Sequence, residues 1–131
     1  TVDTNRYLTA GQLMANSVPV FVHNGVAPDA QTVSQKLQEL DKHYAFIVDG
    51  NNRFYGSISL EKIALLVEGG QSCKLDQSVV KQITPVPEDM PLDQVIERLV
   101  INEGPIPVVG GNGQYSGAIS KGRLLTRMQG E

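Results

Sequence analysis

The sequence contains little cysteine, few aromatic residues and no long apolar run. A single cysteine, Cys73, among 131 residues cannot form an internal disulfide, and it cannot build a zinc site from soft ligands. No stretch approaches the roughly 18 consecutive apolar residues that a membrane-spanning helix needs. These absences favour a soluble domain of the reducing, cytosolic compartment.

Clustered positive charge is also missing. The net charge is −3 and the sequence pI is about 5.3, and Lys and Arg are scattered along the chain. The chain therefore lacks the electrostatic footprint of a nucleic-acid-binding protein. We expect no nucleic-acid partner.

Catalytic and metal-binding patterns are not found in the sequence. His23 and His43 do not stand at a metal-ligand spacing, and no Ser–His–Asp or paired-carboxylate set can be placed on one face. GAISKGRL at 117–124 imitates a phosphate-binding P-loop, but Arg123 replaces the obligatory Lys and Leu124 replaces the magnesium-binding hydroxyl. We expect a non-catalytic chain without a metal site.

The sequence does contain an internal repeat. RFYGSISLEKIALL at 53–66 returns 61 positions later as QYSGAISKGRLLTR at 114–127. The apolar run and turn that precede each copy, YAFIVDGNN and PIPVVGGNG, align at the same offset. Each run, turn and second run is typical of a β-hairpin. Two such units, each too small to bury its apolar face alone, predict two halves that pair.

A helix is predicted ahead of each hairpin. Val33, Leu37, Leu40 and Tyr44 form an apolar stripe of helical period, and Thr32 to Gln35 has the pattern of a capping box. The second copy carries its stripe at Leu92, Val95, Ile96 and Leu99.

A second helix is predicted after each hairpin, because Ser59 and Ser120 stand at N-cap positions before apolar-periodic segments. We expect the first of these helices to stop at Gly69-Gly70. A short helix is expected to open each repeat, after Thr9 and after Asp76. The order in each repeat is then helix, short strand, helix, strand, strand, helix.

The repeated unit resembles the cystathionine-β-synthase (CBS) domain. Its last strand and helix look like hydrophobic-Gly-hydrophobic-hydrophobic-Ser/Thr-x-x-Asp, and YGSIS at 55–59 and SGAIS at 116–120 fit the first part of this pattern. The resemblance covers residues 9–131 and implies an α+β fold, a tandem CBS pair of pseudo-twofold-related repeats with small sheets packed against each other and flanking helices. The predicted organisation is a lead-in segment at 1–8, repeat 1 at 9–70 and repeat 2 at 71–131.

Three stretches are also similar to the C-terminal region of the ATP-binding subunit of bacterial glycine betaine/L-proline ABC importers. They are VDTNRYLTAGQLM, DKHYAFIVDGNNRFYGSIS and GPIPVVGGNGQYSGAISKGRLL. In that family a CBS pair follows the ATPase domain and is associated with osmotic regulation of transport. The resemblance implies a cytoplasmic fragment at the inner face of the plasma membrane. It implies as partners a second copy through the CBS pairs, the attached ATPase domain and the membrane subunit, with the membrane surface as a further candidate contact.

Candidate ligand-binding residues gather at the two strand-to-helix junctions. They are Gly56, Ser57, Ser59 and Lys62 in the first repeat, and Gly117, Ala118, Ser120, Lys121 and Arg123 in the second. A Gly allows close approach of a ligand, and a Ser N-cap marks a helix end that favours anions, so each junction is a candidate phosphate cradle. In the alternative interpretation the glycines serve strand packing and the serines only cap helices. Phe54 and Tyr115 suit either base stacking or the core.

The third position after each Ser argues against the usual ligand of the family. Nucleotide-binding members hold the ribose hydroxyls there with Asp or Asn, whereas this chain has Lys62 and Arg123. A cation cannot accept hydrogen bonds from a diol. We therefore expect no bound cofactor, and an adenine nucleotide or another anionic ligand is the remaining candidate.

The preferred interpretation is a non-catalytic regulatory module that modulates an osmoprotectant importer in response to ionic strength or a ligand. Because the sequence begins without Met, we expect it to be a piece of a longer parent. Two alternatives stay open. One is an adenine-nucleotide-sensing CBS module that controls another enzyme, and the other is a module that only dimerises its parent.

Overall fold

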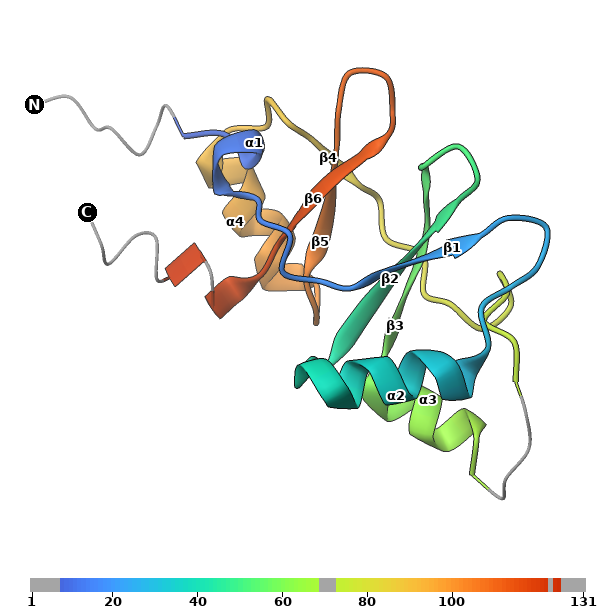
Figure 1. Ribbon diagram of the computed structural model, residues 1–131. Coiled ribbons are helices and arrows are strands. Elements are labelled where there is room, and N and C mark those ends of the chain that lie inside the picture. The colour runs from blue at the N-terminus through green and yellow to red at the C-terminus, as the bar shows by residue number, and fades with distance from the viewer. Residues whose placement is uncertain (1–7, 69–72, 123, 126–131) are drawn as a thin grey trace, which may run out of the picture. The chain divides into compact units, whose positions relative to one another are not determined.

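A computed structural model describes residues 8–68, 73–122 and 124–125, and Figure 1 shows their helices and strands in order. The chain forms two compact units. Unit 1 comprises residues 1–17 and 84–131, and unit 2 comprises residues 18–83. Each unit is built around one three-stranded sheet.

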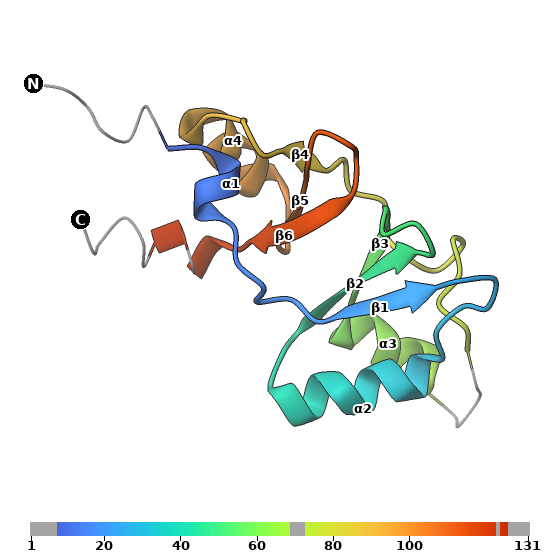
Figure 2. The ribbon, with the colours of Figure 1, turned by 45° about the horizontal axis from the view of Figure 1, so that its top comes forward.

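Unit 2 is a sheet with two helices on one face. The sheet has the order β1 (Val20–His23), β2 (Tyr44–Asp49) and β3 (Phe54–Ser59), with β1 parallel and β3 antiparallel to β2. Helices α2 (Ala30–Leu40) and α3 (Leu60–Leu66) lie side by side below this sheet in Figure 2. The core comprises Ala30, Val33, Leu37, Ala45, Ile47, Ile58, Ile63, Leu75 and Val80.

Unit 1 repeats this plan. Its sheet has the order β4 (Val86–Pro87), β5 (Ile106–Val109) and β6 (Tyr115–Ile119), again with one parallel and one antiparallel pair. Helix α4 (Leu92–Ile101) buries Leu92, Val95 and Leu99 of the predicted stripe and leaves Ile96 half-buried, and α1 (Ala10–Leu13) contacts β4 and β6. Residues 121–122 and 124–125 are helical. The predicted α+β class is confirmed.

The two hairpins share one register. A bulge follows the Ile47–Gly56 pair in β2 and β3, and a bulge follows the Val108–Gly117 pair in β5 and β6. The left-handed residue of each turn also recurs 61 positions later, with φ of 61° at Asn52 and 82° at Gly113. The repeat seen in the sequence is therefore a repeat of backbone geometry.

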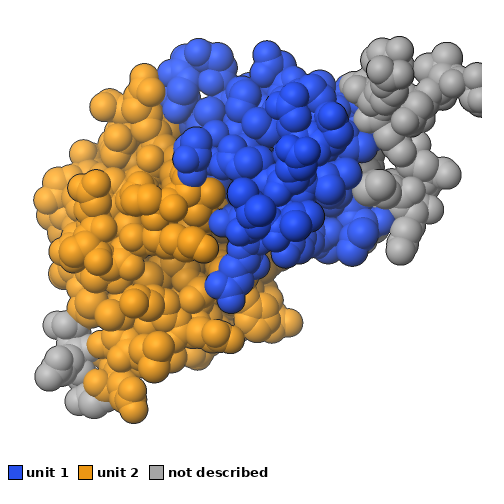
Figure 3. Space-filling model, turned by 180° about the vertical axis from the view of Figure 1, so that it is seen from behind, with its two compact units in different colours: residues 1–17, 84–131 blue, residues 18–83 orange. Residues whose placement is uncertain are grey.

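The compact units divide the chain differently from the sequence repeats at 9–70 and 71–131. Helix α1 belongs to unit 1, because the amides of Ala10 and Gly11 donate to the carbonyls of Met90 and Glu88. Residues 73–83 belong to unit 2, where Lys81 pairs with Ser57. Each repeat thus supplies its opening segment to the unit that holds the other hairpin, as the colouring of Figure 3 records.

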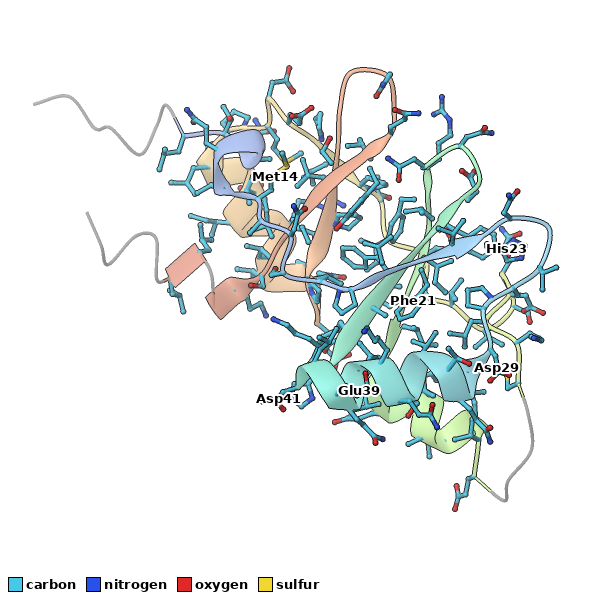
Figure 4. All side chains as sticks on the ribbon, viewed as in Figure 1. Met14, Phe21, His23, Asp29, Glu39 and Asp41 are labelled. Atoms are coloured by element: carbon cyan, nitrogen blue, oxygen red, sulfur yellow. The ribbon has the colours of Figure 1, made fainter. Side chains whose placement is uncertain are left out.

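The predicted start of α2 and the predicted end of α3 are wrong. The predicted helical stripe is also too long, because α2 stops at the left-handed Asp41 and Tyr44 lies in β2. Helix α2 begins at Ala30, because the carboxylate of Asp29 caps it by accepting from the Thr32 amide at 3.3 Å, so the predicted capping box at Thr32 is not used. Figure 4 places Asp29 and Asp41 at the two ends of this helix. Helix α3 ends at Leu66 with Val67 as its C-cap, ahead of the predicted Gly69-Gly70 stop, which lies outside the described residues.

The short helix predicted after Asp76 is also wrong. Residues 77–79 form a turn, in which the Asp76 carboxylate accepts from the hydroxyl and the amide of Ser78. Such a local side-chain bond competes with helix formation. The Ser78 hydroxyl first, and then its amide, lower the pKa of Asp76 below its usual value. Beyond the turn the chain is extended, because Lys81 forms a β-bridge with Ser57.

Candidate functional site

The first strand-to-helix junction, residues 56–62, ends in a capped helix. Ser59 has extended backbone angles, and its hydroxyl accepts a hydrogen bond from the Lys62 amide at 3.0 Å. The predicted N-cap is therefore confirmed, and such a cap contributes about 1 kcal/mol to helix stability. At the second junction, residues 117–122, the Leu124 amide donates to the Ser120 carbonyl at 3.0 Å, as the first bond of a helix does.

The amides at the start of α3 are largely used within the protein. The Lys62 amide donates to Ser59, and the Leu60 amide donates to the His43 carbonyl at 2.8 Å. A phosphate at this helix end would have to compete with both bonds. The geometry therefore favours the structural interpretation of Ser59 over the phosphate cradle.

The two glycines are covered by side chains of the protein. A Cβ atom at Gly56 would lie 2.4 Å from Cγ2 and 2.7 Å from Cβ of Val80. A Cβ atom at Gly117 would lie 3.0 Å from Sδ of Met14, which follows α1 in Figure 4. On this face, the close approach that glycine permits is made by Val80 and Met14, and not by an open ligand site.

The residue after each glycine pairs with an additional extended segment. Ser57 exchanges two backbone hydrogen bonds with Lys81, at 2.9 and 2.7 Å. Ala118, which occupies the equivalent position, exchanges bonds of 3.0 and 2.9 Å with Ala15. Both side chains are buried. Ser57 and Ala118 thus join β3 and β6 to the chain segments that cover the glycines.

The basic residues of the junctions face solvent where the structure describes them. Lys62 and Lys121 are exposed, and Glu61 is the acidic neighbour of Lys62 in the first turn of α3. Arg123 lies outside the described residues. The two lysines are therefore accessible to an anion, to a partner surface or to salt.

The aromatic residues near the junctions pack within their own units. Phe54 meets Phe46 edge to face, with ring centroids 5.3 Å apart, which agrees with the core interpretation. His23, at the end of β1 in Figure 4, stacks on Tyr55 at 4.6 Å. Burial raises the pKa of Tyr115 to about 12, so this phenol stays protonated at physiological pH.

Metal and membrane sites do not emerge from the described part of the chain. Within it, no cluster of three His, Cys, Asp or Glu side chains could hold a metal ion. Over the same residues, no helix has the length and apolarity needed to cross a membrane.

Sequence reasoning missed the residues that complete the junctions, namely Met14, Ala15, Val80, Lys81 and His43. A signal for four of them existed. MANSVP at 14–19 and VKQITP at 80–85 share an apolar first residue and a final Pro at equal spacing. Their partners are distant in sequence, so the local pattern did not reveal what they cover.

Comparison with known proteins agrees with this geometry. Residues 78–130 match the family model of the CBS domain. The crystal structure of a CBS-domain-containing protein of unknown function from Bacillus anthracis superposes with a TM-score of 0.80 at 18% identity, covering 98% of each chain. Residues 78–130 therefore form a CBS domain, and the chain has the fold of a CBS-domain pair. The crystal structure of CBSX2 in complex with AMP has a TM-score of 0.77 at 16% identity, over 94% of this CBS-domain pair and 97% of that chain.

The CBS-domain pair is also similar in sequence to part of a transporter subunit. It is 28% identical over 95 residues, 72% of this chain, to the ATP-binding protein ProV of the glycine betaine/proline betaine transport system of Escherichia coli (strain K12). The match spans 23% of that protein, and a match to the Salmonella typhimurium ProV spans 32%. The CBS-domain pair therefore corresponds to a minor part of these curated relatives.

Proposed function

We propose that this CBS-domain pair is the non-catalytic regulatory module of the ATP-binding subunit of an osmoprotectant importer. The observation that carries the proposal is the similarity to ProV, which extends over 72% of the chain. The geometry supports a regulatory role, because the described junctions use their serines and glycines to hold the fold and present lysines to solvent. As part of such an importer, the chain and its parent would act at the inner face of the plasma membrane.

The exposed junction lysines suit a response to ionic strength. Interactions between exposed charges decay over a Debye length of about 8 Å at physiological salt and over shorter distances at higher salt. Contacts of Lys62 and Lys121 with an acidic surface of the parent or with membrane anions would weaken as salt rises. Such contacts bias the ATPase only if they differ between its two conformations.

A chimera tests this role. The CBS-domain pair replaces the matching region of ProV, and glycine betaine uptake into vesicles is measured against salt. We expect the variant with Lys62→Gln, Lys121→Gln and Arg123→Gln to shift the salt concentration of half-activation at least about twofold, since screened charge pairs are the proposed sensor. Lys36→Gln, on the exposed side of α2, is the control. An unchanged salt response in the triple variant would exclude these charges as the sensor.

A nucleotide-sensing role is the second candidate, because CBSX2, a structural neighbour, is in complex with AMP. Lys62 stands against it, since an ammonium cannot accept from the ribose hydroxyls. Calorimetric titration with AMP and ATP separates the two functions. Micromolar affinity for AMP or ATP would favour the nucleotide sensor, whereas no detectable binding would favour the salt-responsive role.

We also propose that the module forms a homodimer through the faces of its helices. Each unit by itself exposes large apolar side chains on its helices: Leu40 and Leu65 on α2 and α3 in unit 2, and Val100 and Ile101 on α4 with Leu125 in the helical residues after β6 in unit 1. The adjacent pair Val100 and Ile101 is the apolar surface that we propose a second copy covers. A second copy fits, because an isologous contact buries the same surface of both subunits.

Charge placed on this surface should separate the subunits. We expect Ile101→Glu, at a side chain that is 80% exposed, to weaken dimerisation at least tenfold in analytical ultracentrifugation. Val26→Glu, at a loop residue that is 70% exposed, is the matched control and should leave the dimer intact. If the two variants weakened dimerisation equally, the helix faces would not form the dimer interface.

A further inference from the structure

The chain crosses between the two units through two segments of like sequence, MANSVP at 14–19 and VKQITP at 80–85. We call them connector 1 and connector 2. Each begins with the side chain that covers a glycine, Met14 over Gly117 and Val80 over Gly56. Each ends in a Pro directly before the first strand of the other unit, β1 or β4.

Connector 2 is held at closely spaced points. In unit 2, Lys81 exchanges two backbone hydrogen bonds with Ser57, and the side-chain amide of Gln82 donates to the Tyr55 carbonyl at 3.0 Å. In unit 1, the Arg98 guanidinium of α4 donates to the Thr84 carbonyl. Ile83 alone separates the last residue held by unit 2 from the first residue held by unit 1.

Connector 1 has the same arrangement with a longer gap. Ala15 exchanges two backbone bonds with Ala118 of β6 in unit 1, and the Pro19 carbonyl accepts from the Phe46 amide of β2 at 2.9 Å in unit 2. The three residues 16–18 lie between these holding points. Connector 2 is therefore the shorter tether of the two.

We infer that the connectors are coupling elements that transmit a displacement at one strand-to-helix junction to the opposite unit. Ser57 and Ala118 hold the connectors, and each lies two residues before the Ser that starts the next helix. A shift of β3 at its junction moves Lys81 and Gln82. Because Ile83 alone separates Gln82 from Thr84, the shift must also move Thr84 or break its bond to Arg98. Coupling of this kind requires an element with alternative arrangements that both sites bias, and the Arg98 bond supplies one.

This inference stands on hydrogen bonds within the CBS-domain pair, and it holds whichever ligand or partner acts at the junctions. Arg98 has a positioning role that, among the residues the structure describes, its equivalent on α2 does not share. The helices align at an offset of 62, which pairs the buried Val33 and Leu37 with Val95 and Leu99 and makes Lys36 the equivalent of Arg98. The Lys36 ammonium lies 3.9 Å from the Glu39 carboxylate on the exposed face of α2. The two positions therefore form a matched pair for a test.

Amide hydrogen exchange, followed by NMR on the full 131-residue chain, measures the coupling. Arg98→Met removes the bond to Thr84 in unit 1. We expect the Ser57 and Lys81 amides, which lie in unit 2, to exchange about tenfold faster, because local opening of the bridge frees both. Lys36→Met should leave these two amides unchanged.

Two results would overturn the inference. The first is unchanged exchange at Ser57 and Lys81 in the Arg98→Met protein. The second is a uniform acceleration of core amides in both units, which would indicate a general loss of stability. If Arg98→Met does not fold, Arg98→Lys keeps a hydrogen-bond donor on a shorter and more flexible side chain. We then expect a smaller acceleration of exchange, confined to the same two amides.

Discussion

Gly56→Ala is expected to lower the free energy of unfolding by about 3 kcal/mol, although it adds a single methyl group. The added carbon would lie 2.4 Å from Cγ2 and 2.7 Å from Cβ of Val80. Val80 cannot retreat, because the next residue, Lys81, is fixed to Ser57 by backbone bonds of 2.7 and 2.9 Å. The methyl group must therefore displace backbone. Urea denaturation with circular dichroism measures the change.

Gly117→Ala is the control at the equivalent position of the second repeat. Its added carbon would approach Met14, whose closest atom is the flexible Sδ at 3.0 Å. A methionine side chain adapts to such contacts, and loss of glycine entropy from the unfolded chain offsets part of the cost. We expect a change of less than about 1 kcal/mol. Equal losses in the two variants would contradict the assignment of Val80 as the rigid cover of Gly56.

Much of the hairpin geometry could be predicted from the sequence, because it depends on local patterns of apolar and turn residues that occur twice. The 61-residue offset predicted two equivalent hairpins, and the structure gives both the same register with a bulge at the same place. Ser59 was predictable as an N-cap, since a capping hydroxyl needs a partner only three residues away. A local pattern also gave a wrong prediction. The capping pattern at Thr32 suggested a later helix start, but Asp29 caps α2 and the helix begins at Ala30.

The meaning of the candidate site residues was not predictable, because it depends on distant partners. From the sequence, Gly56 could belong to a ligand cradle or serve strand packing. In the structure Val80 packs on Gly56, which favours the packing role on that face. The segment after Asp76 has helical apolar spacing, yet it is extended at Lys81 because the β3 edge offers a bridge at Ser57. Hydrophobic periodicity does not predict a hydrogen-bonded partner that is distant in the sequence.

The structural use of the glycines and serines narrows where regulation can act. If Ser59 caps α3 and Val80 fills the face of Gly56, the accessible charged side chains at the start of α3 are Lys62 and its acidic neighbour Glu61. A cationic surface that responds to salt or to an anionic partner is compatible with that arrangement. The Lys62 ammonium itself offers no acceptor for a ribose diol.

Removal of residues 1–17 is expected to unfold unit 1, although its hairpin and α4 lie more than 70 residues further along the chain. The segment supplies the buried side chains Ala10 and Leu13 and the Met14 cover of Gly117. It also makes backbone bonds to Glu88, Met90, Leu92 and Ala118. At about 1 kcal/mol for each bond and about 2 for the buried Leu, the loss exceeds 5 kcal/mol, comparable to the whole stability of a small domain.

Deletion of residues 1–7, which leaves this segment in place, is the control for that truncation. Its exchange protection should match that of the full chain, whereas in the longer deletion the β5 and β6 amides should lose protection. Unit 2 should lose far less, because residues 73–83, the segment that covers Gly56, remain. If both deletions kept β5 and β6 protected, the second repeat would fold without the opening segment of the first. The exchange of segments between the repeats would then have no energetic role.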